Sequence, residues 1–336
     1  MMQQMLVGLG GLSDPVYVDD VFKTKLYTGN SSTKDINNGI DLDGKGGLVW
    51  LKNRENAAFY TQSPWHHLYD TERLVGRRIS TNEDGYQIND SGSGVTAFNS
   101  NGFSFSNQFF SNRSGIDYVS WTFRKQKGFF DIVTFSGSGT NSTNRRISHS
   151  LGSVPGMIFV KRLSSPDQDW RVYHRERGVD QYQALNNDTK FTTGFNCWGT
   201  APTSSDFGIN EDNLSASTGD FVAYLFAHED ARFGANRDES IIKCGTYNGN
   251  NSNRTIPTGF KPGFVMIKTA TTVDNWVMFD NKRGTNELDA NRDSSDDPAS
   301  DKFSGFSSTG FDLVGGNGAT NSGAATYIYM AIREGL

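Results

Sequence analysis

Residues 155–161 read PGMIFVK, and residues 262–268 read PGFVMIK. The lysines that end these two stretches, Lys161 and Lys268, are 107 residues apart. A step of 109 residues back from Lys161 reaches Lys52, which ends the similar stretch GGLVWLK at 46–52. Similarity that returns at a fixed interval is typical of tandem copies of one structural unit. The sequence therefore predicts three repeats.

Further landmarks follow each lysine in the same order. A polar residue and an arginine come three positions apart, and a long apolar stretch closes each copy: YVSWTFR at 118–124, FVAYLFAH at 221–228 and YIYMAIR at 327–333. The polar and arginine positions are Asp70 and Arg73, His174 and Arg177, and Asp280 and Arg283. These offsets predict repeats at residues 17–126, 127–235 and 236–336, each of ordinary domain size, after an N-terminal leader at 1–16.

The composition indicates an all-β protein. Short β-branched and aromatic runs alternate with clusters of Gly, Asn, Asp and Ser, and no stretch keeps a helical period over several turns. In the closing stretches, alternate residues such as Val119, Trp121 and Phe123 are bulky, which predicts a core-facing side. The repeated PGMIFVK-type stretch is apolar on both sides and should be a central strand. We expect a two-layer sandwich of five to seven strands per repeat, with a three-bladed toroid as the alternative arrangement.

A cross-strand ion pair is expected from the repeat pattern. Lys268 and Asp280 each end an apolar run with matching parity, and so do Lys52 and Asp70. Opposite charges across a hairpin help to set its register. The middle copy has His174 where the other copies have an aspartate, which weakens the expectation there.

Several functional classes are disfavoured. The net charge is −5 and no basic stripe occurs, which argues against nucleic-acid binding. The longest apolar runs are strand-sized, so no membrane insertion is expected. Cys197 and Cys244 cannot make a disulfide framework. The glycines at 8–11 lack the third glycine and the helix of a dinucleotide-binding loop.

No catalytic, cofactor-binding or metal-ligating residue is predicted. The five histidines have no metal-ligand spacing and are expected to be ordinary surface or half-buried side chains. The acidic stretch 289–301, DANRDSSDDPASD, does not fit an EF-hand, so a solvated loop is favoured over a calcium site. Four tryptophans near turns could stack on sugars or on a partner, but the matching repeat positions of two of them, Trp170 and Trp276, favour a core role. The other two are Trp65 and Trp198.

Seven segments carry a resemblance to a known family: GLVWLKNR, HHLYDTER, YVSWTFRKQKGFFDIVTFSGSGT, ISHSLGSVPGMIFVKR, DWRVYHR, FVAYLFAH and SIIKCGTYNG. Together these segments resemble a repeat family of tailed bacteriophages. This family of structural proteins is frequent in phages of marine bacteria and cyanobacteria and is otherwise uncharacterised. The resemblance covers nearly the whole chain and implies a tail-fibre-like or minor structural component of the virion. It transfers no catalytic residues.

The resemblance and the residues lead to one expected function. We expect a non-enzymatic virion protein, a tail fibre or fibre-associated component with a host-adhesion role, made in the host cytoplasm and placed on the tail or outer surface. The alternative is a capsid decoration protein or another minor structural protein; a carbohydrate-active tailspike is more remote, because short β-helix coil repeats are missing. We expect other virion proteins to bind through the leader. We expect further copies of the chain to form a homo-oligomer, with a trimer favoured. A host-surface glycan or protein is expected to bind to loops 180–215 and 285–322.

Overall fold

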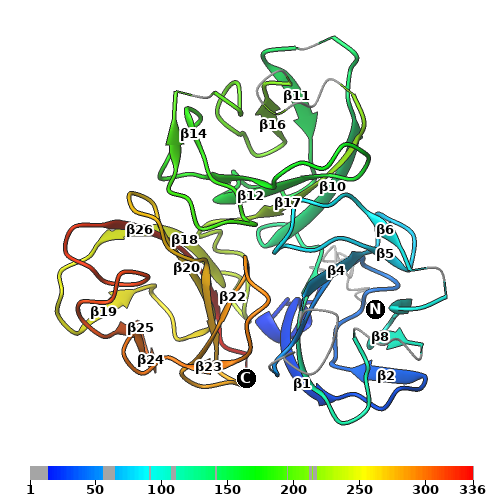
Figure 1. Ribbon diagram of the computed structural model, residues 1–336, viewed down its shortest axis with the longest axis horizontal. Coiled ribbons are helices and arrows are strands. Elements are labelled where there is room, and N and C mark those ends of the chain that lie inside the picture. The colour runs from blue at the N-terminus through cyan, green and yellow to red at the C-terminus, as the bar shows by residue number, and fades with distance from the viewer. Residues whose placement is uncertain are drawn as a thin grey trace, which may run out of the picture.

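The computed structural model describes residues 14–335 except 56–64, 91, 107–110, 141, 195, 212–213 and 215–217. The fold is all-β, as the composition predicted. The described residues form antiparallel strands and one helix, the three-residue 3₁₀ turn η1 (Val18–Asp20). Figure 1 shows three lobes that stand around a common centre. Each lobe contains the described strands of one predicted repeat, and each sheet is built from strands of a single repeat.

The first repeat is a two-layer sandwich. Its inner sheet has the order β1-β9-β3-β4, its outer sheet has the order β2-β8-β7, and β5 and β6 form a small hairpin. The strands are β1 (Phe22–Thr28), β2 (Lys34–Asn37), β3 (Gly47–Asn53), β4 (His66–Asp70), β5 (Arg77–Arg78), β6 (Ile88–Asn89), β7 (Val95–Asn99), β8 (Gly102–Phe105) and β9 (Asp117–Arg124).

The second repeat keeps this topology in reduced form. Its inner sheet has the order β10-β17-β12-β13, and the pairs β11-β16 and β14-β15 lie outside it. The strands are β10 (Phe130–Ser136), β11 (Arg145–Ser148), β12 (Met157–Arg162), β13 (Arg171–His174), β14 (Gln181–Tyr182), β15 (Thr192–Thr193), β16 (Asp206–Ile209) and β17 (Asp220–Phe226).

The third repeat extends the inner sheet. The order is β18-β26-β20-β21-β22-β23, and the outer sheet is β19-β25-β24. The strands are β18 (Ile242–Asn248), β19 (Arg254–Pro257), β20 (Pro262–Thr269), β21 (Val277–Asp280), β22 (Asn286–Asp289), β23 (Asp297–Pro298), β24 (Phe303–Ser307), β25 (Gly310–Leu313) and β26 (Thr326–Arg333). Because some strands have only two residues, the number of described strands in each repeat exceeds the expected five to seven strands.

The repeated stretch is a central strand in every copy, as predicted. Strands β3, β12 and β20 each lie between the closing strand and the fourth strand of their inner sheet. The registers match as well, because Trp50 faces Trp121, Phe159 faces Tyr224 and Met266 faces Met330. Equivalent residues of the three repeats can therefore be assigned from strand pairing.

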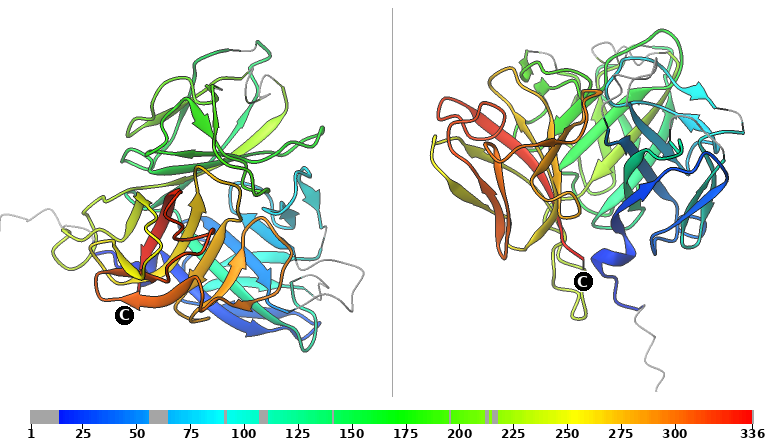
Figure 2. Two further views of the ribbon diagram at one scale, coloured as in Figure 1. Left: turned by 60° about the vertical axis from the view of Figure 1, so that its left-hand side comes forward. Right: turned by 60° about the horizontal axis from the view of Figure 1, so that its bottom comes forward.

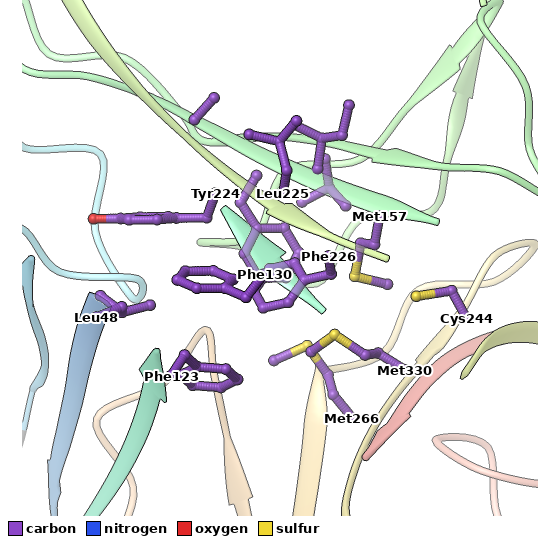
Figure 3. Packing of buried hydrophobic residues seen from close by; sticks show 14 of the residues in the cluster. Leu48, Phe123, Phe130, Met157, Tyr224, Leu225, Phe226, Cys244, Met266 and Met330 are labelled. Atoms are coloured by element: carbon purple, nitrogen blue, oxygen red, sulfur yellow. The ribbon is translucent and has the colours of Figure 1, made fainter. Parts of the chain in front are cut away.

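The inner sheets are buried on both faces. The bulky side of each closing strand, for example Trp121, Tyr224 and Met330, lies in one hydrophobic cluster to which all three repeats contribute. Figure 3 shows Phe123, Phe226 and Met330 from different repeats converging there. In repeats 1 and 3 the other side faces the outer layer of the same repeat, where Tyr118 and Tyr329 belong to separate clusters. In repeat 2 the other side, for example Leu225, belongs to the common cluster as well. The molecule thus combines three sandwiches with the central arrangement of the toroidal alternative.

The expected lysine–aspartate pairs do not form. Asp280 lies opposite Phe264, and Asp70 lies opposite Leu48, whereas Lys268 and Lys52 are at the other ends of their strands. In an antiparallel hairpin the end of the first strand meets the beginning of the second. Residues that end both strands are therefore far apart, and the pairing prediction was wrong for this reason.

Candidate functional site: the junctions between repeats

The three repeated lysines join neighbouring repeats. All three side chains are completely buried. Lys161 Nζ donates to Asp84 O and to Gln168 O, both at 2.6 Å. Lys268 Nζ donates to Asp188 O at 3.2 Å and Asp274 O at 2.7 Å, and Lys52 Nζ to Ser294 O at 2.6 Å and Asn53 O at 2.8 Å. In each case one acceptor belongs to the lysine's own repeat and the other to an adjacent repeat.

These contacts run around a closed ring. Repeat 2 donates to repeat 1 through Lys161, repeat 3 donates to repeat 2 through Lys268, and repeat 1 donates to repeat 3 through Lys52. We call these the first, second and closing junctions. The chain connects repeats at the first two only, yet the closing junction has the same lysine contact. Three equivalent interfaces are what a ring requires, and a string of domains would have two.

Tryptophan indoles strengthen the first two junctions. Trp170 Nε1 donates to Ser80 O at 2.8 Å, and Trp276 Nε1 donates to Ala184 O at 3.0 Å. At the closing junction the equivalent carbonyl, Ala290 O, accepts a 2.6 Å hydrogen bond from Thr81 Oγ1. His66 adds a second contact there, since its Nε2 lies 2.9 Å from Asp289 O. Trp50 Nε1 donates to His66 Nδ1, so Nε2 carries the proton.

The repeated aspartates and arginines of repeats 1 and 3 form buried ion pairs within their repeat, and each aspartate is also hydrogen-bonded across a junction. Arg73 Nε lies 2.7 Å from Asp70 Oδ2, and Arg283 Nε lies 2.7 Å from Asp280 Oδ2. Each carboxylate takes a further hydrogen bond from the next repeat. Tyr224 Oη donates to Asp70 at 2.6 Å, and Trp121 Nε1 donates to Asp280 at 3.0 Å. Buried charges are tolerated only when they are paired in this way.

The presence of a histidine at position 174, where the other repeats have an aspartate, is explained by the residue that faces it from the next repeat. The residue equivalent to Tyr224 and Trp121 is Met330, whose side chain has no hydrogen-bond donor. A carboxylate at position 174 would lose that partner. His174 instead accepts from Glu176 N through Nδ1 at 3.3 Å and has Nε2 3.4 Å from Tyr329 O. Burial lowers the pKa of His174 to about 3, which keeps the ring neutral. Arg177, released from an acid, donates to Gln181 Oε1 at 2.7 Å.

Burial also changes the protonation of the lysines. It lowers the pKa of Lys52 to about 7 and the pKa of Lys161 and Lys268 to about 8, although nearby aspartates act in the opposite direction. A neutral amine still has two N–H groups, which is the number of carbonyls that each lysine contacts. The lysines therefore hold the junctions together in either protonation state.

The acidic stretch 289–301 is part of the closing junction. Asp296 pairs with Arg54 at 2.8 Å and with Arg283 at 2.9 Å, and Asp289 is buried. Burial raises the pKa of Asp289 to about 7. The prediction of a solvated loop was therefore wrong for these residues. Within the described ranges, no three His, Cys, Asp or Glu side chains gather as a metal site.

Other sequence candidates are also structural. Trp170, Trp198 and Trp276 are completely buried and unavailable for stacking on a ligand, and Trp65 is half-buried. His66, His67 and His174 are fully buried, although surface or half-buried positions were expected, whereas His149 and His228 are half-buried as expected. Cys197 and Cys244 are free and buried. The lysine acceptors at 188 and 294 place parts of the two loops expected to face a host against neighbouring repeats instead. The glycines at 8–11 lie outside the described residues.

Sequence reasoning found the junction positions but missed their role. Arg73, Arg177 and Arg283 occupy the same position in their repeats. The same spacing gives the lysine acceptors Asp84 and Asp188 and residue 294 a shared position, so the sequence contained a signal for the three acceptors. The described part of the chain contains no helix long and apolar enough to cross a membrane. No curated protein matches the sequence. One family model spans residues 18–335, that is, all three repeats as a single unit, and the chain belongs to this family, described as Domain of unknown function (DUF7483).

Proposed function

We propose that the chain is a non-enzymatic structural protein of a bacteriophage virion, a tail fibre or fibre-associated component that contributes to host adhesion. The resemblance of its repeats to phage structural proteins supports this proposal. The geometry that supports it best is the ring, in which the repeated polar residues join one repeat to the next. A particle exposed to the environment benefits from such internal bracing.

The proposal includes partners and position. The leader at 1–16 binds other virion proteins, the chain assembles as a homotrimer, and the protein lies on the tail or outer surface. Multivalent display raises weak contacts with a host glycan or protein to useful avidity. Residues 17–19 and 333–335 line the same cavity, and the right-hand view of Figure 2 shows η1 beside the C-terminal end of the chain, which supports a common point of attachment.

Localisation on purified particles tests the proposal. Antibody against the recombinant chain, coupled to gold, should label the tails of virions whose genome encodes the protein. Recombinant protein added to host cells should reduce adsorption of the same phage. Label on the capsid with unchanged adsorption would favour the alternative of a capsid decoration protein. Absence of the chain from purified particles would refute a virion role altogether.

A further inference from the structure

A surface groove accompanies each of the three junctions. Each groove lies between the first strand of one repeat and the turn after the fourth strand of its neighbour. At the first junction, β10 residues and residues 72–77 line a groove of about 630 Å³. At the second junction, β18 residues and Glu176 line the groove, and at the closing junction β1 residues and Lys282 do so. The closing groove measures only about 190 Å³ and is bordered by Glu334.

Each groove is bordered by the edge strand of an inner sheet. Strands β1, β10 and β18 stand at the end of their inner sheets and pair with one neighbour, β9, β17 and β26 respectively. Apart from the isolated bridge between Gln126 and Phe130, no further pairing involves β10 among the described residues. Backbone N–H and C=O groups along such an edge can accept another strand.

Lysines protect two of these edges and not the third. Strand β1 carries Lys23 and Lys25, and β18 carries Lys243. Lysines on an edge disfavour pairing with a foreign strand, since pairing would crowd and desolvate the charge. The strand registers equate these positions with Asp131 and Val133 of β10. Asp131 is buried and Val133 is half-buried, so β10 itself carries no lysine at its edge. The nearby cations are at its two ends, where Lys125 lies 3.5 Å from Asp131 and Arg145 Nη1 donates to Ser136 O at 2.6 Å.

An apolar wall of repeat 1 reaches the groove beside β10 through Leu74. The described residues include seven exposed large apolar side chains, and four of them belong to the segment 74–88 of repeat 1. The wall consists of Leu74 (72% exposed), Val75 (48%), Tyr86 (47%) and Ile88 (40%). At the positions equivalent to Leu74, the other repeats have Gly178 and Gly284. Figure 1 shows the β5–β6 hairpin next to β10 and β17.

One cation of the groove, Arg77, is open to an anionic group. Arg77 lines the groove and has no carboxylate within ion-pair distance among the described residues. Of the two acids that line the groove, Glu72 pairs with Lys125 at 2.5 Å, whereas Asp220 accepts a 2.6 Å hydrogen bond from the uncharged Ser136 hydroxyl. A carboxylate brought into the groove would therefore find an available guanidinium.

We propose that β10 is a docking site for an extended strand of a partner protein, one with alternating apolar residues and a carboxylate opposite Arg77. The strand adds to the inner sheet of repeat 2 as a fifth member beside β10. Backbone hydrogen bonds along β10 supply affinity, whereas the apolar wall and Arg77 supply specificity. This site is independent of whether the chain resides in a virion.

A peptide-binding experiment tests the site on the full chain. The probe is a fluorescent peptide in which valine alternates with threonine and one threonine is replaced by aspartate. We expect saturable binding by anisotropy and slower amide exchange at 130–136. Val133→Lys copies the edge of β1 and should weaken binding at least tenfold. Thr246→Lys, on the equivalent exposed edge of β18, is the matched control and should leave binding unchanged.

A second variant keeps the test independent of the folding of Val133→Lys. Arg77→Gln should weaken binding of the aspartate peptide severalfold and leave binding of the matching asparagine peptide unchanged. The proposal is overturned by lack of saturable binding, by equal affinity of folded Val133→Lys, or by slower exchange in β1 or β18 instead. Loss of a dimer on Val133→Lys would also overturn it, because the occupant would then be a second copy of the chain.

Discussion

Trp121 Nε1 donates a 3.0 Å hydrogen bond to Asp280 Oδ2, which joins the first repeat directly to the last. The same carboxylate oxygen lies 2.7 Å from Arg283 Nε. The two interacting side chains come from ends of the chain that have no covalent connection at this junction. This contact is one of several at the closing junction that distinguish a closed ring from three linked domains.

Removal of that donor should open the closing junction partly. In Trp121→Phe the buried carboxylate loses a hydrogen bond, at a cost of about 1–3 kcal/mol, and the smaller phenyl ring leaves a cavity that adds to the loss. Urea unfolding measures the loss. Tyr224→Phe removes the equivalent donor to Asp70 at the first junction and should cost a similar amount, whereas exposed Tyr86→Phe should change little. A negligible effect of both core variants would contradict the role of these contacts.

The buried lysines should make the free energy of unfolding depend on pH, and the direction of this dependence follows from their lowered pKa. The pKa of Lys161 is about 8 in the folded protein and close to 10.5 when exposed, so between these values unfolding takes up a proton. The free energy of unfolding therefore rises with pH there, by at most about 1.4 kcal/mol per pH unit for one lysine.

A variant separates the contribution of Lys161 to the pH dependence of stability from the contributions of cysteines and tyrosines, which titrate in the same pH range when exposed. Lys161→Met cannot titrate and leaves the carbonyls of Asp84 and Gln168 without their donor. The stability of the wild type relative to Lys161→Met should increase from pH 8 to pH 10. Exposed Lys25→Met is the control and should show a constant difference. A stability gap for Lys161→Met that stays constant or narrows with rising pH would show that the lysine stays charged in the folded protein.

The match between His174 and Met330 predicts a rescue. His174→Asp places a carboxylate beside a methionine that cannot donate, and we expect a loss of about 3 kcal/mol. Adding Met330→Tyr recreates the pair of Asp70 and Tyr224, with Arg177 in the place of Arg73. The double variant should recover at least half of the loss in urea unfolding. Additive destabilisation by the two changes would contradict the equivalence of the junctions.

A closed ring tolerates a change of chain order. Residues 14 and 335 can be joined by a short linker and the chain opened at the turn between Gln126 and Phe130, which gives the order repeat 2, repeat 3, repeat 1. We expect one cooperative transition and a stability within about 1 kcal/mol of the parent chain, because the same three junctions remain. Separate transitions for individual repeats, followed by calorimetry, would argue against the ring.

The sequence predicted the repeats and the strands more accurately than it predicted the contacts between side chains. The copies around Lys52, Lys161 and Lys268 identified central strands, and the alternation in the closing strands identified the side that faces the common core. The ion pairs failed because the parity of a strand does not tell which ends meet. The acceptors at Asp84, Asp188 and Ser294 are backbone carbonyls, which any residue provides, so residue identity gave no indication of them.

Exposure was also misjudged where repeats meet. Histidines and acidic loops are usually at the surface of a single domain. Here His66 and Asp289 are buried, because a second repeat covers them. Only the arrangement of the repeats shows this, and the sequence left two arrangements open.

A crystal structure tests the ring most directly, through the position of Lys52. The ring requires Lys52 Nζ to donate to Ser294 O at about the 2.6 Å found here, as Lys161 and Lys268 do to their neighbours. Electron density that places Lys52 Nζ in solvent, with the first and third repeats apart, would contradict it.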